Sequence, residues 1–349
     1  MDKEIVLRFP ERFSFTVTNA CNLRCRMCGQ WSGAGYIANK VRPMSHMNVS
    51  HWNRLVDEIA DHGGKGILIR GGEPFLYPGV MDLLRRIRSR NIFISIDTNG
   101  TMIEKHVDQL VALENVHLTF SVDGPERIHD RVRGVQGAFQ KTKDNIIRLI
   151  QAEKRAGVEI GKSLTFTISP DSVNGLGELP DVARDLGIET VCIVPYYYVP
   201  ETVGRQYESE LRQLGCDAFS WRGFRHDASG VDAHDFETQY RRFMDRLGGL
   251  SLYPYMPLKM EEYETWFSDA VTPVGDPGCR MIECFLDIQP NGDADFCVDF
   301  PDYVMGNVLE SSIEEVWNSH RAERFREARR QHPFAVCRRC GAKYMAVQE

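Results

Sequence analysis

The sequence predicts an α/β fold built on a parallel sheet, and two observations lead to this prediction. Short β-rich runs alternate with helical patterns through the first two-thirds of the 349-residue chain. Each notable motif directly follows one of those runs. Such β/α units in series imply parallel strands with helices outside, arranged as an open doubly wound sheet or as a partial barrel. In both arrangements the chemistry sits at the carboxyl ends of the strands.

The strand candidates are short β-rich segments. They lie at 13–18, 66–70, 92–98, 116–122, 163–169 and 190–195. Between the first two, apolar residues recur at helical spacing in Trp52, Leu55, Val56 and Ile59, after the plausible cap Ser50. Similar apolar spacing marks the helical segments 103–111, 139–150 and 179–186.

Composition and charge narrow the class of protein. The chain is 42% hydrophobic and 26% charged, as is ordinary for a soluble globular protein. Its net charge of −7 argues against general nucleic-acid binding. The N-terminus has no apolar signal region and no stretch approaches a membrane span, so we expect a cytoplasmic protein without a membrane partner. Ten cysteines in a reducing compartment indicate metal ligands or redox chemistry.

Three cysteines, Cys21, Cys25 and Cys28, fall within eight positions directly after the first strand. Soft thiolates select iron–sulfur clusters, zinc or copper. A [4Fe–4S] cluster normally takes four cysteines, so three leave one iron with an exchangeable position where a substrate or cofactor can bind. The alternatives are three structural cysteines, or a zinc site completed by a distant histidine such as His46 or His51.

Three further motifs follow the second, third and fourth strands. They read RGGEP at 70–74, DTNG at 97–100 and SVDGPERIHDRVRG at 121–134. Together with the cysteine triplet, and in this order, they make the chain resemble the radical S-adenosylmethionine (SAM) enzymes, in the branch with a C-terminal SPASM or twitch auxiliary-cluster domain. The resemblance implies a partial (β/α)6 parallel barrel with a small C-terminal auxiliary-cluster domain.

The resemblance also implies roles for individual residues. Cys21, Cys25 and Cys28 hold a [4Fe–4S] cluster whose open iron takes the amino and carboxylate groups of SAM. Further contacts to SAM are implied for Gly71, Gly72, Glu73, Asn99, Ser121 and Arg133. One departure is Met27, which stands before the third cysteine where many members have an aromatic residue, although a thioether can also pack on a purine.

Five more cysteines lie in the tail, with the spacing C-x4-C-x12-C followed by C-x2-C. This resembles the shorter, twitch form of the auxiliary module, which holds one auxiliary cluster. Its ligands are then Cys279, Cys297, Cys337 and Cys340, with Cys284 left over. A second assignment makes Cys284 a ligand and frees one member of the CxxC pair. A structural zinc on the same thiolates is the alternative to a cluster.

Cys284, if it is not a ligand, has two interpretations. It is either a hydrogen-atom donor, as a radical epimerase requires, or a small buried apolar residue. Asp299 and Asp302 either contact a hydroxylated or amine-bearing substrate or solvate a loop. Cys192 and Cys216 are expected to be core or linker residues.

The domain boundaries follow from these features. Residues 1–200 are expected to form the barrel and 279–349 the twitch module. The segment 201–278 lacks clear β/α alternation and is rich in aromatic, proline and acidic residues, so we expect a linker or a substrate-facing insertion there.

The resemblance implies that reductive cleavage of SAM supplies a 5′-deoxyadenosyl radical that abstracts hydrogen from a substrate, with flavodoxin or ferredoxin as electron donor. We expect dehydrogenation or epimerisation of a small polar metabolite such as a sugar, an aminocyclitol or a natural-product intermediate. The alternatives are a maturase of a ribosomally made peptide and a non-enzymatic iron–sulfur protein. The small molecule is favoured because only 20 residues precede Cys21, whereas peptide maturases often carry a precursor-binding domain there.

Overall fold

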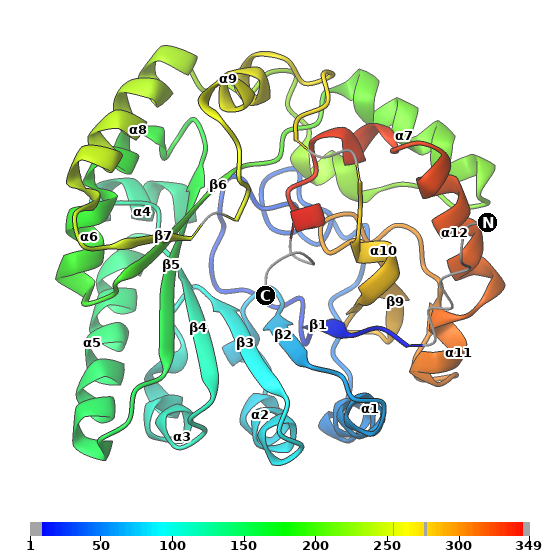
Figure 1. The fold of residues 1–349 in the computed structure, drawn as a ribbon, viewed down its shortest axis with the longest axis horizontal. Helices are drawn as coiled ribbons and strands as arrows, with labels where there is room; N and C mark the ends of the chain where they lie inside the picture. Colours follow the sequence, from blue (N-terminus) through cyan, green and yellow to red (C-terminus); the bar gives the residue numbers. More distant parts are fainter. Residues whose placement is uncertain (1–8, 254, 276–277, 345–349) are drawn as a thin grey trace, which may run out of the picture.

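A curved sheet of ten strands forms the centre of the computed structural model, which describes residues 9–253, 255–275 and 278–344 (Figure 1). Residues 1–8, part of the N-terminus without an apolar signal region, lie outside the described residues. The strands are β1 (Arg12–Thr16), β2 (Gly66–Arg70), β3 (Phe93–Thr98), β4 (Val116–Ser121), β5 (Gly161–Ile168), β6 (Thr190–Pro195), β7 (Ser251–Tyr253), β8 (Phe285–Ile288), β9 (Asp293–Asp295) and β10 (Gly306–Asn307).

Helices connect the strands and run along the outer side of the sheet (Figure 1). The α-helices are α1 (Val49–Asp61), α2 (Val80–Ser89), α3 (Val107–Val111), α4 (Glu126–Arg133), α5 (Ala138–Ala156), α6 (Leu179–Leu186), α7 (Glu201–Gln213), α8 (Ala233–Leu247), α9 (Met260–Ser268), α10 (Met281–Cys284), α11 (Ile313–Trp317) and α12 (His320–Gln331). Short 3-10 helices occupy Pro74–Leu76, Ile103–His106, Val173–Glu178, Ser220–Phe224, Ala335–Arg339 and Ala342–Tyr344.

The strand order decides between the two architectures that the sequence left open. Strands β1 to β7 are neighbours in chain order and pair in parallel throughout. A doubly wound sheet reverses its strand order at a switch point, and these strands do not. The fold is therefore a partial parallel barrel, as predicted. Strands β2 and β6 match their predicted bounds, and the ends of the other four differ by at most two residues.

The C-terminal residues extend the same sheet. Strand β8 pairs in parallel with β1, with Phe13 opposite Leu286, and β9 and β10 continue beyond it as antiparallel strands. An edge strand leaves a row of backbone N–H and C=O groups unpaired, and β8 covers this row on β1. The backbone pairing therefore fixes where the C-terminal cysteines lie relative to the barrel.

Residues 201–278 are more regular than expected from the sequence. They form helices α7, α8 and α9, and β7 adds a strand beside β6. Helix α8 begins at the N-cap Asp232, but its buried residues are only Phe236 and Phe243, which lie two turns apart. Such a narrow apolar stripe gives little helical periodicity in the sequence.

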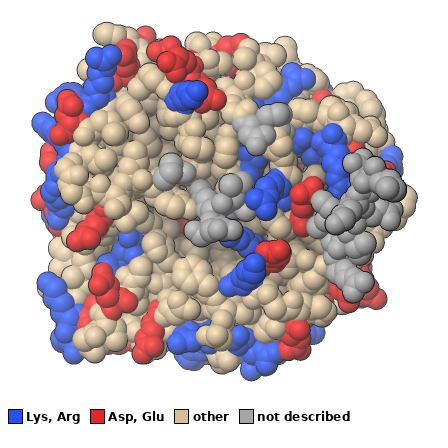
Figure 2. Space-filling view, in the orientation of Figure 1, with Lys and Arg blue, Asp and Glu red and all other residues tan. Residues whose placement is uncertain are grey.

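The hydrophobic core lies between the sheet and its outer helices. Phe15 on β1 is fully buried and packs on Trp52 of α1, with ring centroids 4.6 Å apart. Both signs of charge are interspersed along the rim of the face in Figure 2. None of the described helices has the length and apolarity needed to cross a membrane.

Replacing Phe15 with alanine tests this packing. Phe15→Ala should lower the free energy of unfolding by about 3–5 kcal/mol, because it removes a fully buried ring and leaves a cavity. Urea denaturation followed by circular dichroism under anaerobic conditions measures the change. The control Met244→Ala removes a side chain that is 42% exposed on α8 and should shift the value by no more than about 0.5 kcal/mol. Equal effects of the two substitutions would contradict the packing described here.

Candidate functional site

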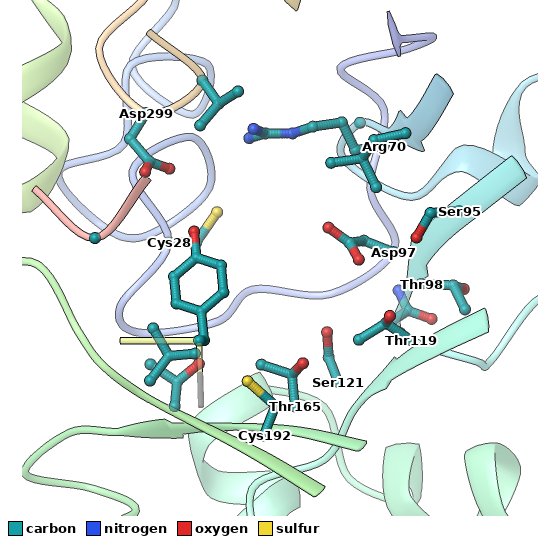
Figure 3. Close-up of a pocket in the computed structure, with 18 of the residues that line it drawn as sticks. Cys28, Arg70, Ser95, Asp97, Thr98, Thr119, Ser121, Thr165, Cys192 and Asp299 are labelled. Carbon is teal, nitrogen blue, oxygen red and sulfur yellow. The ribbon is translucent and has the colours of Figure 1, made fainter. Parts of the chain in front are cut away.

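A cavity of about 970 Å³ lies inside the curve of the sheet (Figure 3). Its wall includes Cys21, Cys25 and Cys28 of the loop after β1, and Asp299 and Gly341 of the C-terminal segment. Ligand pockets of proteins usually measure about 300–1,000 Å³, so this cavity is at the upper end of the range. It has room for a cofactor and part of a substrate together.

The inner wall carries hydroxyl groups from successive strands. Alternate residues of a strand face opposite sides, and here the inward set includes many hydroxyl groups beside apolar residues such as Leu68 and Val194. It includes Ser95, Thr119, Ser121, Ser163, Thr165, Thr167 and Thr190. Of these residues, only Ser121 was predicted from the sequence to belong to the site. The signal was present in the alternation of β4, where buried Leu118 and Phe120 are flanked by more accessible polar residues.

The three-cysteine loop is held by backbone contacts with α4. The amides of Arg24 and Arg26 donate to the carbonyls of Arg133 and Val132, both at 3.0 Å. Within the loop, the amide of Leu23 donates to Cys21 Sγ at 3.4 Å. Amide donors to sulfur stabilise thiolates, and thiolates are the form that ligates iron. Burial raises the pKa of the free Cys21 thiol to about 12, so a bound metal is needed to deprotonate it at neutral pH.

Gly71 and Gly72 let the end of β2 pass directly against the loop. A Cβ atom on Gly71 would lie 2.5 Å from the carbonyl oxygen of Thr18, and one on Gly72 would lie 2.3 Å from that of Ala20. The amides of Gly72 and Glu73 donate to the same two oxygens at 2.8 Å. Any side chain at position 72 would therefore push apart two backbone segments.

Glu73 ties two of the sequence motifs together. Its carboxylate accepts hydrogen bonds from the Phe75 amide at 3.1 Å, the Thr98 hydroxyl at 2.8 Å and the Asn99 amide at 2.9 Å. Burial raises the pKa of Glu73 to about 7, although these donors lower it. Asn99 in turn donates to the Asn22 side chain at 3.0 Å. The second and third strand ends are thus locked to the cysteine loop.

The side chain of Arg133 contacts the three-cysteine loop. Its Nη1 donates to Cys25 Sγ at 3.7 Å, and its Nε lies 2.6 Å from Asp123 Oδ2. Both side chains are almost fully buried, so the ion pair is shielded from water. Asp123 therefore fixes the guanidinium that faces Cys25. Met27 and Ser121 both line the main cavity near this point.

Four of the C-terminal cysteines surround a second, smaller cavity with apolar walls. Its lining includes Cys279, Cys297, Cys337 and Cys340, together with Phe296, Phe325 and Phe334. No described group of three His, Cys, Asp or Glu residues is placed to hold a single metal ion. The donor set of four thiols is the one that a closed iron–sulfur cluster takes, so these residues fit that group.

Cys284 packs against the same small apolar cluster as Cys279 and Cys340. It does not appear among the described residues that line either cavity, and its thiol donates to the Arg280 carbonyl at 3.3 Å. Cys192, by contrast, was expected to be a core or linker residue, and its sulfur faces the main cavity from β6 (Figure 3). Burial raises the pKa of Cys192 to about 12, which keeps it a neutral thiol.

Three charged side chains line the main cavity. The sequence did not predict that they belong to one group. The Arg70 side chain extends towards Asp299, and the Asp97 carboxylate lies to one side (Figure 3). Burial lowers the pKa of Arg70, but the charges of Asp287, Asp299 and Asp97 raise it overall. Burial also raises the pKa of Asp97 to about 6, although Arg70 opposes this. These groups can bind charged or polar parts of a ligand.

The side chain of Asp302 holds two segments of the chain together. Its carboxylate accepts from the amides of Phe219 and Ser220 at 2.8 and 3.0 Å and from the Tyr207 hydroxyl at 3.1 Å. It is 3% exposed, so it neither solvates a loop nor faces the main cavity. It joins the C-terminal segment to residues 207–220.

Comparison with known proteins identifies two domains in the chain. The family model "Radical SAM superfamily" matches residues 15–171, and the model "Iron-sulfur cluster-binding domain" (SPASM) matches residues 279–341. The first match contains Cys21, Cys25 and Cys28, and the second contains Cys279, Cys284, Cys297, Cys337 and Cys340.

Individual relatives are distant. Fe-coproporphyrin III synthase of Methanosarcina barkeri is 27% identical over 53% of this chain and 43% of its own length. The subtilosin bacteriocin biosynthesis protein AlbA of Bacillus subtilis is 23% identical over 89% of this chain and 60% of its own length. The crystal structure of Streptococcus suis SuiB bound to S-adenosylmethionine superposes with a TM-score of 0.63 at 18% identity, covering 90% of this chain and 66% of that one. The chain thus spans about half the length, or less, of the first curated relatives that it matches.

Asp123→Asn tests whether the buried ion pair supports the cluster loop. Loss of the charge on Asp123 should release Arg133 from its position beside Cys25 and weaken iron retention about 10- to 100-fold. Iron content after a timed challenge with a chelator measures the effect on reconstituted protein. The control Asp171→Asn breaks the 2.9 Å surface pair between Asp171, which follows β5, and Arg26 of the same loop, and it should retain iron like the wild type. Equal retention in all three proteins would contradict this role of Asp123.

Gly72→Ala tests the close approach of β2 to the loop. The added methyl group would meet backbone oxygens of residues 19 and 20 at 2.5 Å and closer, so we expect the three-cysteine loop to shift and its iron to be lost. The control Gly33→Ala lies beyond the third cysteine and meets nothing within 4 Å. Iron analysis and the absorbance of the reconstituted proteins distinguish them. Full iron loading of Gly72→Ala would show that the approach is less restrictive than described.

Proposed function

Because the chain belongs to the radical SAM superfamily and carries a C-terminal SPASM domain, we propose that it is an enzyme that abstracts hydrogen from one residue of a peptide substrate. Its cofactors are SAM, a [4Fe–4S] cluster with an open position and an auxiliary iron–sulfur cluster. When bound, SAM and the open cluster supply a 5′-deoxyadenosyl radical, which removes hydrogen from unactivated C–H bonds.

One observation carries this proposal: the same cavity is lined by the three-cysteine loop and by residues beside the C-terminal cysteines. Cys25 and Cys28 line it together with Val298, Asp299 and Gly341 of the C-terminal segment. A substrate in this cavity can contact both parts of the chain. This arrangement supports hydrogen abstraction beside the three-cysteine loop and uptake of an electron by the C-terminal segment.

The peptide substrate is favoured by the relatives and by the walls of the cavity. AlbA is named for biosynthesis of a bacteriocin, and a second structure of SuiB holds the precursor peptide SuiA. The small polar metabolite expected from the sequence has no comparable support. A tetrapyrrole, suggested by Fe-coproporphyrin III synthase, is the competing class. The hydroxyl groups of β3 to β6 can pair with peptide N–H and C=O groups along a chain, whereas a coproporphyrin carries its carboxylates at the rim and offers few partners over the face of the macrocycle.

In this proposal the residues of the chain have the following roles. Cys21, Cys25 and Cys28 hold the open cluster, and Arg133 steadies Cys25. The proposed contacts to SAM are Gly71, Gly72, Glu73, Asn99, Ser121 and Arg133. Arg70, Asp97 and Asp299 orient the polar groups of the substrate, because their charged ends face the cavity.

The remaining assignments complete the proposal. Cys279, Cys297, Cys337 and Cys340 hold the auxiliary cluster, and Cys284 stays outside both sites. The barrel comprises 1–200, the connecting segment 201–278 and the cluster module 279–349. Flavodoxin or ferredoxin supplies electrons in a reducing compartment, where thiolate ligands remain unoxidised.

Two measurements test the proposal. Anaerobically reconstituted protein reduced with dithionite should release 5′-deoxyadenosine from SAM, and Cys25→Ala should reduce this release to background. Conversion of Cys192 to serine should leave the cluster intact and serves as the matched control for loss of a cavity thiol. Unchanged release in Cys25→Ala would refute the radical SAM activity.

The class of substrate is tested by isotope transfer. Short peptides encoded beside the gene are prepared in deuterated form and offered separately from deuterated monosaccharides and a deuterated coproporphyrin. Because the abstracted atom ends on 5′-deoxyadenosine, its mass should rise by about one unit with a peptide alone. A mass increase with the sugar or the porphyrin, and none with any peptide, would replace the peptide by that class.

A further inference from the structure

The side chain of Tyr197 connects the main cavity to the four-cysteine site. Tyr197 follows β6 in the barrel and lines the main cavity. Its hydroxyl donates a hydrogen bond to the sulfur of Cys340, with an Oη–Sγ distance of 3.4 Å. A residue of the barrel wall therefore touches a proposed ligand of the auxiliary cluster that lies 143 positions away in the chain.

Two backbone amides fix the direction in which the hydroxyl donates. Gly341 N and Ala342 N both donate to Tyr197 Oη, at 2.5 and 3.2 Å. A phenolic oxygen has one proton and accepts through its lone pairs. Both lone pairs of the phenolic oxygen accept hydrogen bonds from these amides. The hydroxyl proton is therefore the part of the group that points to the sulfur of Cys340.

The ring of Tyr197 is also held in place by its neighbours. It packs edge-on against Phe224 and Phe300, with centroid distances of 5.6 and 5.7 Å, and lies 6.3 Å from Trp266. Aromatic contacts of this geometry stabilise a single ring orientation. The donor is therefore held in place before any cluster binds.

The Asp299 side chain also faces the Tyr197 hydroxyl, as a second acceptor for its single proton. Asp299 lines both the main cavity and the smaller cavity around the four cysteines. Asp299, Tyr197 and Cys340 thus form a continuous polar path from the proposed substrate position to the auxiliary site. The phenol lies at its centre.

We propose that Tyr197 is a positioning residue that raises the reduction potential of the auxiliary cluster by donating its hydroxyl proton to the Cys340 ligand. Reduction adds negative charge to the cluster and its sulfur ligands. A hydrogen-bond donor stabilises that charge more in the reduced than in the oxidised state, and hydrogen bonds to sulfur are among the factors that set cluster potentials. The proposal rests on the auxiliary-cluster part of the proposed function and is independent of the substrate class.

Potentiometry of the holoenzyme tests this role without any substrate. Tyr197→Phe keeps the ring in its aromatic surroundings and removes only the hydroxyl. At a fixed potential, the ratio of reduced to oxidised auxiliary cluster should fall about tenfold, which is a downward shift of about 59 mV for a one-electron couple. Electron paramagnetic resonance follows both clusters, and addition of SAM identifies the signal of the open one. The potential of the open cluster should not change.

The neighbouring tyrosine provides a matched control. Tyr196 is also buried and lines the main cavity, but its hydroxyl donates to the carbonyl of Ser229. Tyr196→Phe should leave both potentials unchanged. An unchanged auxiliary potential in Tyr197→Phe, or an equal fall in Tyr196→Phe, overturns the proposal. Failure of SAM cleavage in otherwise loaded protein would refute the proposed function and leave this measurement valid.

A second measurement applies if Tyr197→Phe does not retain the auxiliary iron. The tyrosines of the unsubstituted chain are then replaced biosynthetically by 3-fluorotyrosine, whose hydroxyl is more acidic and donates a stronger hydrogen bond. The auxiliary potential should rise while that of the open cluster stays constant. Absence of a rise overturns the proposal.

Discussion

The contact between the end of β2 and residues 18–20 is the constraint on which the site depends. Gly71 and Gly72 have no side chains, so the backbone of one strand end lies directly against the segment that enters the cysteine loop. Glu73 extends this contact by accepting from Thr98 and Asn99 at the next strand end. The cysteines are therefore placed by backbone and buried polar contacts of neighbouring strands, which leave little freedom to the loop.

The arrangement of the sheet places the other sequence motifs beside this contact. All strands from β1 to β7 are parallel, so their carboxyl ends meet along one edge, where the motifs lie. The pairing of β8 with β1 brings the segment that carries the second group of cysteines beside the same cavity, which Val298, Asp299 and Gly341 help to line. A ligand in that cavity is consequently close to both groups, although Cys28 and Cys279 are separated by 250 residues.

The interior of the barrel differs from a packed core. Hydroxyl groups and the charges of Arg70, Asp97 and Asp299 face inwards, while most of the fully buried apolar residues of the barrel strands lie in the core. Charged groups without a partner are costly inside a protein, so such a wall is stable only when water or a ligand fills it. The polar wall is the feature that most directly supports a polar substrate.

The sequence by itself determined the parallel α/β class, the six main strands and the two groups of cysteines, because strand periodicity and motif spacing are local properties of the chain. The resemblance implied a partial barrel, and the strand order of the tertiary structure decided it. It did not reveal the helices of 201–278, whose buried residues are too sparse for a clear period. The tertiary structure alone decided that Cys192 faces the cavity while Cys284 does not, and that Arg70, Asp97 and Asp299 meet. It also decided that Tyr197 touches Cys340. Those relations join residues that are distant in the chain, and only the closing of the curved sheet brings them together.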